Sequence, residues 1–489
     1  MATIATAQVR PAGHIEASNA LAPYRGSLDR RSAAHLLRRA GFGGTSQEIE
    51  RYASMSPSFA AETLTHFADA SGLPPPPDVY DPRAALFALR GELRGADSTA
   101  KRQARQSIRR EMVRSILSLQ NWWLGRMLAT PAPLQEKMTF FLHGHFTTAA
   151  IQKGVWPAYV WQQNQLYRSN ALGNLRDLTL AVSKDPAMLL YLDNALNNKA
   201  HPNENYAREL MELFTLGHGN YTEEDVRQSA RAFTGWSLNR KAGTFFDNRR
   251  IHDDGVKTFL GRSGNFDGTD IVNIIYQQAA CPKFWAEKLL SEFVYGNPEP
   301  ALIEQVAALI HRHDYALAPV MSTLLQSNVF YSERAYRALV KSPVEYVVGT
   351  HKAFGLAAIV PGSLPALRAM GQVLFYPPNV AGWPGGAAWI TSQTVISRQN
   401  FVAQLVNSQQ MRQGASWIDG LPMNADTSAR ALVAEILQND VPAQAYGQLV
   451  GYLDGAGTSA LGRLSPENAA ERVRGAAYLT MAMPAYQLS

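Results

Sequence analysis

The sequence predicts an all-α fold, a compact multi-helix body with one small β-hairpin. Apolar residues recur at helical spacing along most of the 489-residue chain, and strand signals are few. Strand and helix patterns do not alternate, which argues against a parallel sheet or a barrel of strands and helices. Hydrophobic residues make up 46% of the chain and charged residues 18%, a balance typical of globular proteins with a sizeable core.

Helix signals begin after residues 1–26, an Ala-, Gly- and Pro-rich segment that we expect to be a disordered tail. The first helix is predicted to start at Ser27 or Asp29, because both side chains cap helix starts well. Gly243–Phe246 is the best strand signal and predicts the hairpin. Capping boxes or apolar spacing predict further helices from 45–48, over 116–128, over 134–142, from 342–345, over 432–453 and over 469–483.

Composition excludes several classes of protein. Cys281 is the only cysteine, so an internal disulfide is excluded, and we expect a buried, inert thiol. No run of eighteen apolar residues occurs, so no membrane-spanning helix is expected. The net charge is +6, and the basic cluster over 101–110 lacks nucleic-acid motifs, so we interpret it as a solvated helix or connector without a nucleic-acid partner. The first 26 residues lack the order of a secretory signal, which makes the cytoplasm the default location.

A predicted helix over 203–217 carries the most specific polar pattern. Glu204, Arg208 and Glu212 are four residues apart and share one face, with Glu209 at its edge. A solvated charged face is the simpler interpretation, with each pair worth only about 0.2–0.5 kcal/mol. In the alternative, the face lines a cleft, Arg208 holds an anion, and the carboxylates act as acids, bases or metal ligands.

Two histidines in the segment His143-Gly144-His145 form the second candidate site. On a strand both imidazoles would point to one side and bind a metal, whereas on a helix they point about 200° apart. The preceding periodicity is helical and puts His145 on the apolar face, which favours a hydrogen-bonded core histidine. Gly144 can end the helix, so the metal-binding alternative stays open.

Three further positions are candidates for a pocket. His252 precedes Asp253, a pair that orients an imidazole for acid–base chemistry or simply forms a turn. Trp236 ends an apolar segment beside the predicted hairpin. Trp383 lies in the Pro- and Gly-rich segment 377–389, which forms either a pocket wall or a seal over the core. We expect Trp236, Asp253 and Trp383 to contribute to ligand binding.

The order of these segments resembles a known bacterial family, the domain of unknown function 1800, over about residues 28–405. The family's histidine segment usually reads closer to Trp-His-Asn-His-Phe, whereas this chain has Leu142-His-Gly-His-Phe146, which loosens the backbone at Gly144. Segments that carry the resemblance are Leu36–Gly43, Phe140–Thr147, Asn203–Gly217, Tyr221–Trp236, His252–Gly268, Lys341–Glu345 and Pro377–Ile390.

The resemblance implies no established activity. It divides the chain into a helical family domain over 27–410 and C-terminal helices over 411–489 on the same body. Relatives are often found beside members of another family, the domain of unknown function 1501, which is similar to alkaline-phosphatase-like hydrolases and often exported. The resemblance therefore implies a partner of that kind, with export as its passenger as an alternative location.

Two hypotheses for function follow. In the first, the chain is an enzyme with a polar pocket between helices, a metal-dependent hydrolase or an oxidoreductase that uses a divalent metal. Glu204, Arg208, Glu209, Glu212 and His252 are the candidate catalytic residues, and the two histidines of 143–145 are the candidate metal ligands. In the second, the chain is a non-catalytic partner or scaffold for the alkaline-phosphatase-like protein.

Overall fold

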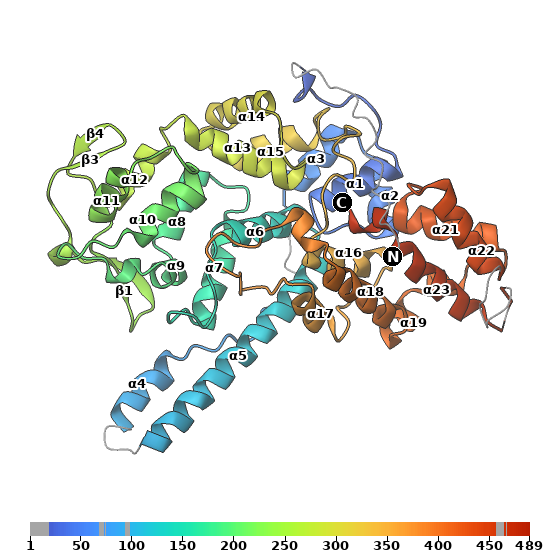
Figure 1. Ribbon diagram of the computed structural model, residues 1–489, viewed down its shortest axis with the longest axis horizontal. Helices are drawn as coiled ribbons and strands as arrows, with labels where there is room; N and C mark the ends of the chain where they lie inside the picture. Colours follow the sequence, from blue (N-terminus) through green and yellow to red (C-terminus); the bar gives the residue numbers. More distant parts are fainter. Residues whose placement is uncertain (1–18, 68–72, 74, 93–97, 456–463, 466) are drawn as a thin grey trace.

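The computed structural model describes residues 19–489 except 68–72, 74, 93–97, 456–463 and 466. Figure 1 shows a body of helices, which confirms the predicted fold class. Within the described ranges, strands occur in two antiparallel hairpins, β1 (Trp236–Asn239) with β2 (Thr244–Asp247) and β3 (Lys257–Phe259) with β4 (Arg262–Gly264). The first contains the predicted strand Gly243–Phe246. This strand pairs with Trp236–Asn239 before it, whereas Arg249–Ile251 after it forms a 3₁₀ turn. The sequence did not predict the second hairpin.

The helices gather around a central pair, α6 (Pro133–His145) and α7 (Pro157–Ser169) (Figure 1). Two helices, α4 (Arg83–Glu92) and α5 (Ser98–Ala129), project from the body as an arm. The remaining α-helices are α1 (Arg30–Arg39), α2 (Ser46–Ala53), α3 (Pro57–Thr65), α8 (Leu175–Ser183), α9 (Pro186–Tyr191), α10 (Glu204–Glu209), α11 (Glu223–Ala232), α12 (Gly268–Ile275), α13 (Ala280–Phe293), α14 (Pro300–Arg312), α15 (Leu317–Leu325), α16 (Pro343–Ala353), α17 (Ser363–Ala369), α18 (Ser392–Val406), α19 (Gln409–Gly414), α20 (Ser416–Asp419), α21 (Ala425–Leu437), α22 (Ala443–Asp454) and α23 (Ala469–Ala482).

Short helical turns connect these helices. A π-helical turn, η3 (Leu210–Thr215), continues α10, and 3₁₀ turns form η2 (Asn194–Leu196), η4 (Arg249–Ile251), η5 (Gly386–Trp389) and η6 (Pro484–Gln487). None of the helices in the described ranges is both long and apolar enough to cross a membrane.

Predicted helix starts agree closely with the structure. Asp29 caps α1, and capping boxes at Thr45 and Ser342 start α2 and α16. The predicted helix over 432–453 is instead two helices, because the backbone of Gln438 and Asn439 is left-handed between α21 and α22. Pro442 then favours a new helix start rather than a continuation.

The predicted tail is only partly within the described residues, since 1–18 lie outside them. Residues 19–24 differ from the prediction, because their backbone is bound to the segment after α15. The N–H of Tyr24 donates to Gln326 at 2.8 Å, and the N–H of Val329 donates to Ala20 at 3.0 Å. These backbone bonds hold the chain against the body before α1 begins.

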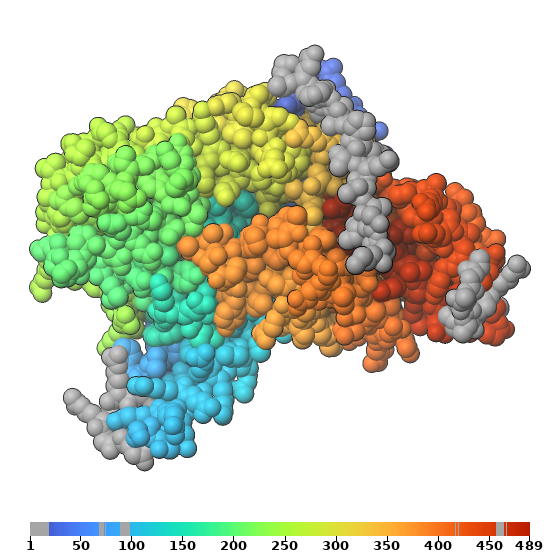
Figure 2. Space-filling view, viewed as in Figure 1, coloured from blue at the N-terminus to red at the C-terminus, as the bar shows by residue number. Residues whose placement is uncertain are grey.

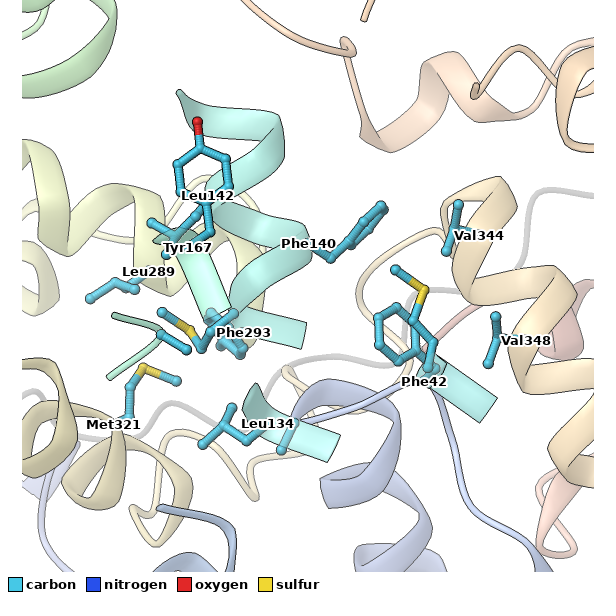
Figure 3. Packing of buried hydrophobic residues seen from close by; sticks show 14 of the residues in the cluster. Phe42, Leu134, Phe140, Leu142, Tyr167, Leu289, Phe293, Met321, Val344 and Val348 are labelled. Atoms are coloured by element: carbon cyan, nitrogen blue, oxygen red, sulfur yellow. The ribbon is translucent and has the colours of Figure 1, made fainter. Parts of the chain in front are cut away.

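Helix α6 is the centre of the hydrophobic core. Phe140 points towards Val344 on one side, while Leu142 lies with Leu289 and Tyr167 on the other (Figure 3). A helix that is buried on all faces is usually apolar on all faces. Helix α6 is buried in this way, yet it also buries charged and polar side chains. Each of these needs a partner inside the protein.

Glu136 is fully buried on α6 and is held by three side chains. Arg168 donates to both carboxylate oxygens, at 2.6 and 3.0 Å, and Trp123 donates at 2.9 Å. Arg126 forms a further ion pair with the same carboxylate. Burial raises the pKa of Glu136, but the two guanidinium groups lower it more, so the carboxylate stays charged.

Lys137, the next residue, is also buried, and its side chain contacts α13 and α16 instead of α5 and α7. Its Nζ lies 2.8 Å from Glu292 on α13 and also forms an ion pair with Glu345 on α16. Burial lowers the pKa of Lys137, but the two carboxylates raise it more and keep the ammonium charged. Two adjacent residues of α6 therefore join α5, α7, α13 and α16 through buried charges.

Replacing Glu136 with Gln is expected to lower the free energy of unfolding by about 3–5 kcal/mol, because two buried guanidinium groups lose their counter-charge. Urea denaturation followed by circular dichroism measures the change. Glu111→Gln is the matched control, since its pair with Arg114 on α5 is exposed and is worth at most about 1 kcal/mol. Equal effects of the two substitutions would contradict the role of the buried cluster.

Asp185, the N-cap of α9, makes stability depend on pH. Burial raises its pKa from 3.8 to about 7, although Met188 N–H and Gln163 Nε2 donate to it. The protonated form favours the folded state, so this stabilisation is complete below pH 4 and is lost as pH rises towards 7. Asp185→Asn should therefore gain stability relative to wild type between pH 4 and pH 8, by up to about 4 kcal/mol. Denaturation curves for both proteins across this pH range give the difference. A difference that does not change with pH would contradict the raised pKa of Asp185.

Candidate functional site

A pocket lies where α6, α13, the start of α16 and the loop before α18 meet. We call it the α6–α13 pocket. It has a volume near 260 Å³ and receives side chains from each of these segments. The residues that matter for its chemistry are Phe141, Gly144, His145, Lys288, Ser291, Glu292, Ser342, Glu345, Gln372, Trp383 and Trp389.

His145 forms part of the pocket wall at the C-terminal end of α6. Its Nε2 is 3.0 Å from the carbonyl oxygen of Phe214, at the end of the π-helical turn, where helix carbonyls lack helical partners. Nε2 therefore carries the proton, and Nδ1 is the acceptor of the ring. Burial, with Lys288 nearby, lowers the pKa of His145 to about 3, so the imidazole is neutral at ordinary pH.

His143 lies behind the pocket wall and does not line it. Its Nε2 accepts the N–H of Phe375 at 3.1 Å, and its ring packs against Trp383 with centroids 5.6 Å apart. Burial lowers its pKa to about 3. The side chain thus holds the loop that carries Trp383, through one hydrogen bond and one ring contact.

Gly382 fixes the same loop against α6. A Cβ atom on Gly382 would lie 2.4 Å from the carbonyl oxygen of Gly144, and its φ of +80° favours glycine. Thr147 donates its hydroxyl to the carbonyl of Val380 nearby. Gly144 itself stays helical, and no atom lies within 4 Å of the position that its Cβ would take. A side chain at 144 would therefore extend into open space at the pocket.

Lys288 brings an uncompensated cation to the pocket. Among the described residues none forms a hydrogen bond or an ion pair with its Nζ, which lies 5.3 Å from the centre of the Phe284 ring. The side chain is exposed, yet its surroundings remove enough water to lower its pKa, with Glu287 opposing this weakly. By contrast, the buried Lys137 forms ion pairs with two carboxylates.

Glu292 and Glu345 supply the negative charge of the pocket, and both are held by Lys137. Glu345 also accepts the backbone N–H of Ser342 at 2.7 Å as part of the α16 capping box. Burial raises the pKa of Glu345, but Lys137 lowers it more, so this carboxylate stays charged. The pocket thus contains two fixed carboxylates and one free ammonium group.

The predicted charged face of α10 lies elsewhere. Arg208 pairs with Glu204 at 3.1 Å and with Glu223 of α11 at 2.7 Å, and all three side chains are partly exposed. Glu212 accepts the hydroxyl of Tyr221 at 2.5 Å. Burial, aided by Glu212, raises the pKa of Glu209. None of the predicted residues from this face lines the α6–α13 pocket.

His252, Asp253 and Trp236 also lie outside the pocket: Trp236 begins β1 of the first hairpin, and the other two lie in the segment between the two hairpins. Nδ1 of His252 bonds the Thr234 carbonyl at 2.7 Å, and Arg231 donates to both carboxylate oxygens of Asp253, at 2.7 and 3.1 Å. Trp236 is buried among aromatic rings. Of the predicted site residues, His145 and Trp383 line the pocket, with His143 directly behind Trp383.

The residues present do not fit the predicted two-histidine metal site. Both rings project from one helix in different directions, His143 towards Phe375 and His145 towards Phe214, and each already uses its Nε2. No group of three His, Cys, Asp or Glu side chains with metal-binding geometry occurs in the part of the chain that the structure describes. A bound metal therefore stays a prediction, and the described residues offer no set of side chains that would bind it.

Sequence reasoning missed the residues that α13 and α16 contribute. Ser291 and Glu292 lie three and four residues after Lys288, which puts these polar side chains on one face of the helix. That pattern was a usable signal. Glu345 was assigned only to a capping box, and its second contact with Lys137 depends on long-range packing that spacing does not reveal.

Gly382→Ala is expected to displace the loop from α6 and to lower the free energy of unfolding by more than about 2 kcal/mol, because the new methyl group overlaps a backbone carbonyl. Gly355→Ala is the matched control: its φ of +70° is also positive, but no atom lies within 4 Å of its Cβ position. Denaturation curves for both variants, with amide exchange of 380–390, measure the effects. A larger loss for Gly355→Ala would contradict the docking of Gly382 on α6.

Comparison with known proteins identifies the family. Residues 35–488 match the family described as a protein of unknown function (DUF1800), and this range includes the C-terminal helices α21–α23. No curated protein and no solved structure matches the chain. The ordered segments predicted this family over about residues 28–405, and the match extends further, through the C-terminal helices. Since it spans nearly the whole sequence, the chain belongs to the DUF1800 family.

Proposed function

We propose that the protein is an enzyme whose active site is the α6–α13 pocket, and that it binds a small organic anion there. The observation that carries the proposal is Lys288, a cation in the pocket that forms no ion pair or hydrogen bond among the described residues. The two pocket carboxylates are ion-paired with Lys137 rather than with Lys288, so the Lys288 ammonium group is available to an anionic substrate.

The other pocket residues support a substrate with a polar part and a flat or apolar part. The neutral His145 offers Nδ1 as a hydrogen-bond acceptor, in a tautomer fixed by Phe214. Trp383 and Trp389 provide apolar surface on the facing wall. A volume near 260 Å³ lies just below the range of about 300–1,000 Å³ for typical ligand sites, which favours a small molecule.

General acid catalysis is the chemistry that this arrangement favours. A lowered pKa makes Lys288 a better proton donor than an ordinary lysine, and the site holds it beside a fixed acceptor on His145. The proposal uses the chain's own side chains and needs no metal. The predicted partnership with an alkaline-phosphatase-like protein and the predicted location both stay predictions.

Binding of small carboxylates and phosphate monoesters, measured by thermal shift and then calorimetry, tests the proposal. Lys288→Met and Gly144→Leu should each weaken binding at least tenfold, the first by removing the cation and the second by filling the pocket. Lys283→Met is the matched control on the same helix, because Lys283 pairs with Glu304 outside the pocket. Binding should also weaken as pH rises from 7 to 10, since deprotonation removes the charge of Lys288.

Turnover of a bound anion separates an enzyme from a binding protein. His145→Gln can still donate to Phe214 but lacks the ring acceptor that orients the substrate in the pocket with Lys288, so it should bind the anion and lose about 10²-fold in kcat. Binding that is unaffected in both Lys288→Met and Gly144→Leu would contradict the site. Tight binding without turnover of any bound anion would contradict the enzymatic part.

A further inference from the structure

The arm presents a face of α5 that the body does not cover. Figure 1 shows α5 extending away from the body, and Figure 2 shows the arm standing clear of it. Arg110, Val113, Arg114 and Leu117 are spaced three and four residues apart, so they form one stripe along α5 about 10 Å long. Val113 and Leu117 are 40% and 39% exposed.

The stripe continues into a groove at the body end of α5. Leu117 lines this groove together with Leu364, Leu367, Val373 and Leu374, from α17 and the segment after it. The groove has a volume near 370 Å³ and a largely apolar lining. Its walls come from α5 on one side and from α17 with the segment after it on the other. Gln120 of α5 joins the two sides by donating to the Leu374 carbonyl at 2.7 Å.

The charge around this apolar strip is positive. Arg110 and Arg114 flank it on α5, and Arg368 lines the groove from α17. Glu111, which pairs with Arg114 at 2.8 Å, is the acidic neighbour on α5 among the described side chains. An occupant of this surface therefore has to offer apolar side chains together with negative charge.

We propose that this surface, Arg110 to Leu117 with the groove beside α17, is a docking site for an acidic amphipathic helix of a partner protein. Apolar side chains at helical spacing fit the groove, and carboxylates beside them pair with the three arginines. A membrane surface matches less well, because a flat bilayer does not enter a groove between two helices. The proposal is independent of the α6–α13 pocket.

Two synthetic peptides test it with the full chain. Both are 18-residue amphipathic helices with the same leucine positions, but one carries Glu and the other Lys on its polar face. Fluorescence anisotropy should show that the Glu peptide binds at least tenfold more tightly and weakens with added salt. Leu117→Glu and Arg114→Glu should each reduce this binding at least tenfold. Ile396→Glu, a change at an exposed apolar residue of α18, is the matched control and should not.

Val113→Glu is a second variant, on the exposed stripe of α5, and circular dichroism shows whether each variant is folded. Vesicles of phosphatidylcholine with phosphatidylserine are the competing probe. The proposal is supported if the Glu peptide binds the wild type and binds the Leu117, Arg114 and Val113 variants more weakly. Equal binding of both peptides, loss in Ile396→Glu as large as in Leu117→Glu, or binding to the vesicles without binding to the Glu peptide would overturn it.

Discussion

The buried charges of Glu136 and Lys137 on α6 are the constraint on which the rest of the structure depends. A buried ion costs several kcal/mol unless it is paired, so the helices that supply the partners have fixed positions. Glu136 fixes α5 and α7 through Arg126 and Arg168, and Lys137 fixes α13 and α16 through their glutamates. Apolar packing around α6 supplies the bulk of the stability, while these pairs specify which helix lies where.

The pocket follows from the same pairs. Its two carboxylates belong to the glutamates that bind Lys137, so the element that organises the core also sets the charge of the pocket wall. Because those carboxylates are ion-paired with Lys137, Lys288 is the cation of the pocket lining that forms no ion pair among the described residues. A helix held rigidly by its buried face is a suitable support for His145 at its C-terminal end.

The sequence was sufficient for fold class and helix starts, because caps and apolar spacing are local signals. Thr45 and Ser342 each form the capping box that their sequence predicts. The candidate site was predicted less well. The charged residues of α10 have strong local spacing but form partly exposed pairs, whereas Lys288 and Glu345 depend on segments that meet only after folding. His145 and Trp383, which both line the pocket, were singled out because an apolar environment around a polar or aromatic residue is visible in the chain itself.

One short segment connects the two proposed sites. Gln372 lines the α6–α13 pocket, while Val373 and Leu374 line the groove beside α5. Phe375, the next residue, donates its N–H to His143 and so positions the loop that carries Trp383. A helix bound in the groove would therefore press on the opposite side of the segment that supports the pocket wall. Since packed segments move between discrete arrangements rather than deforming smoothly, a partner at the arm has a direct physical route to the shape of the pocket.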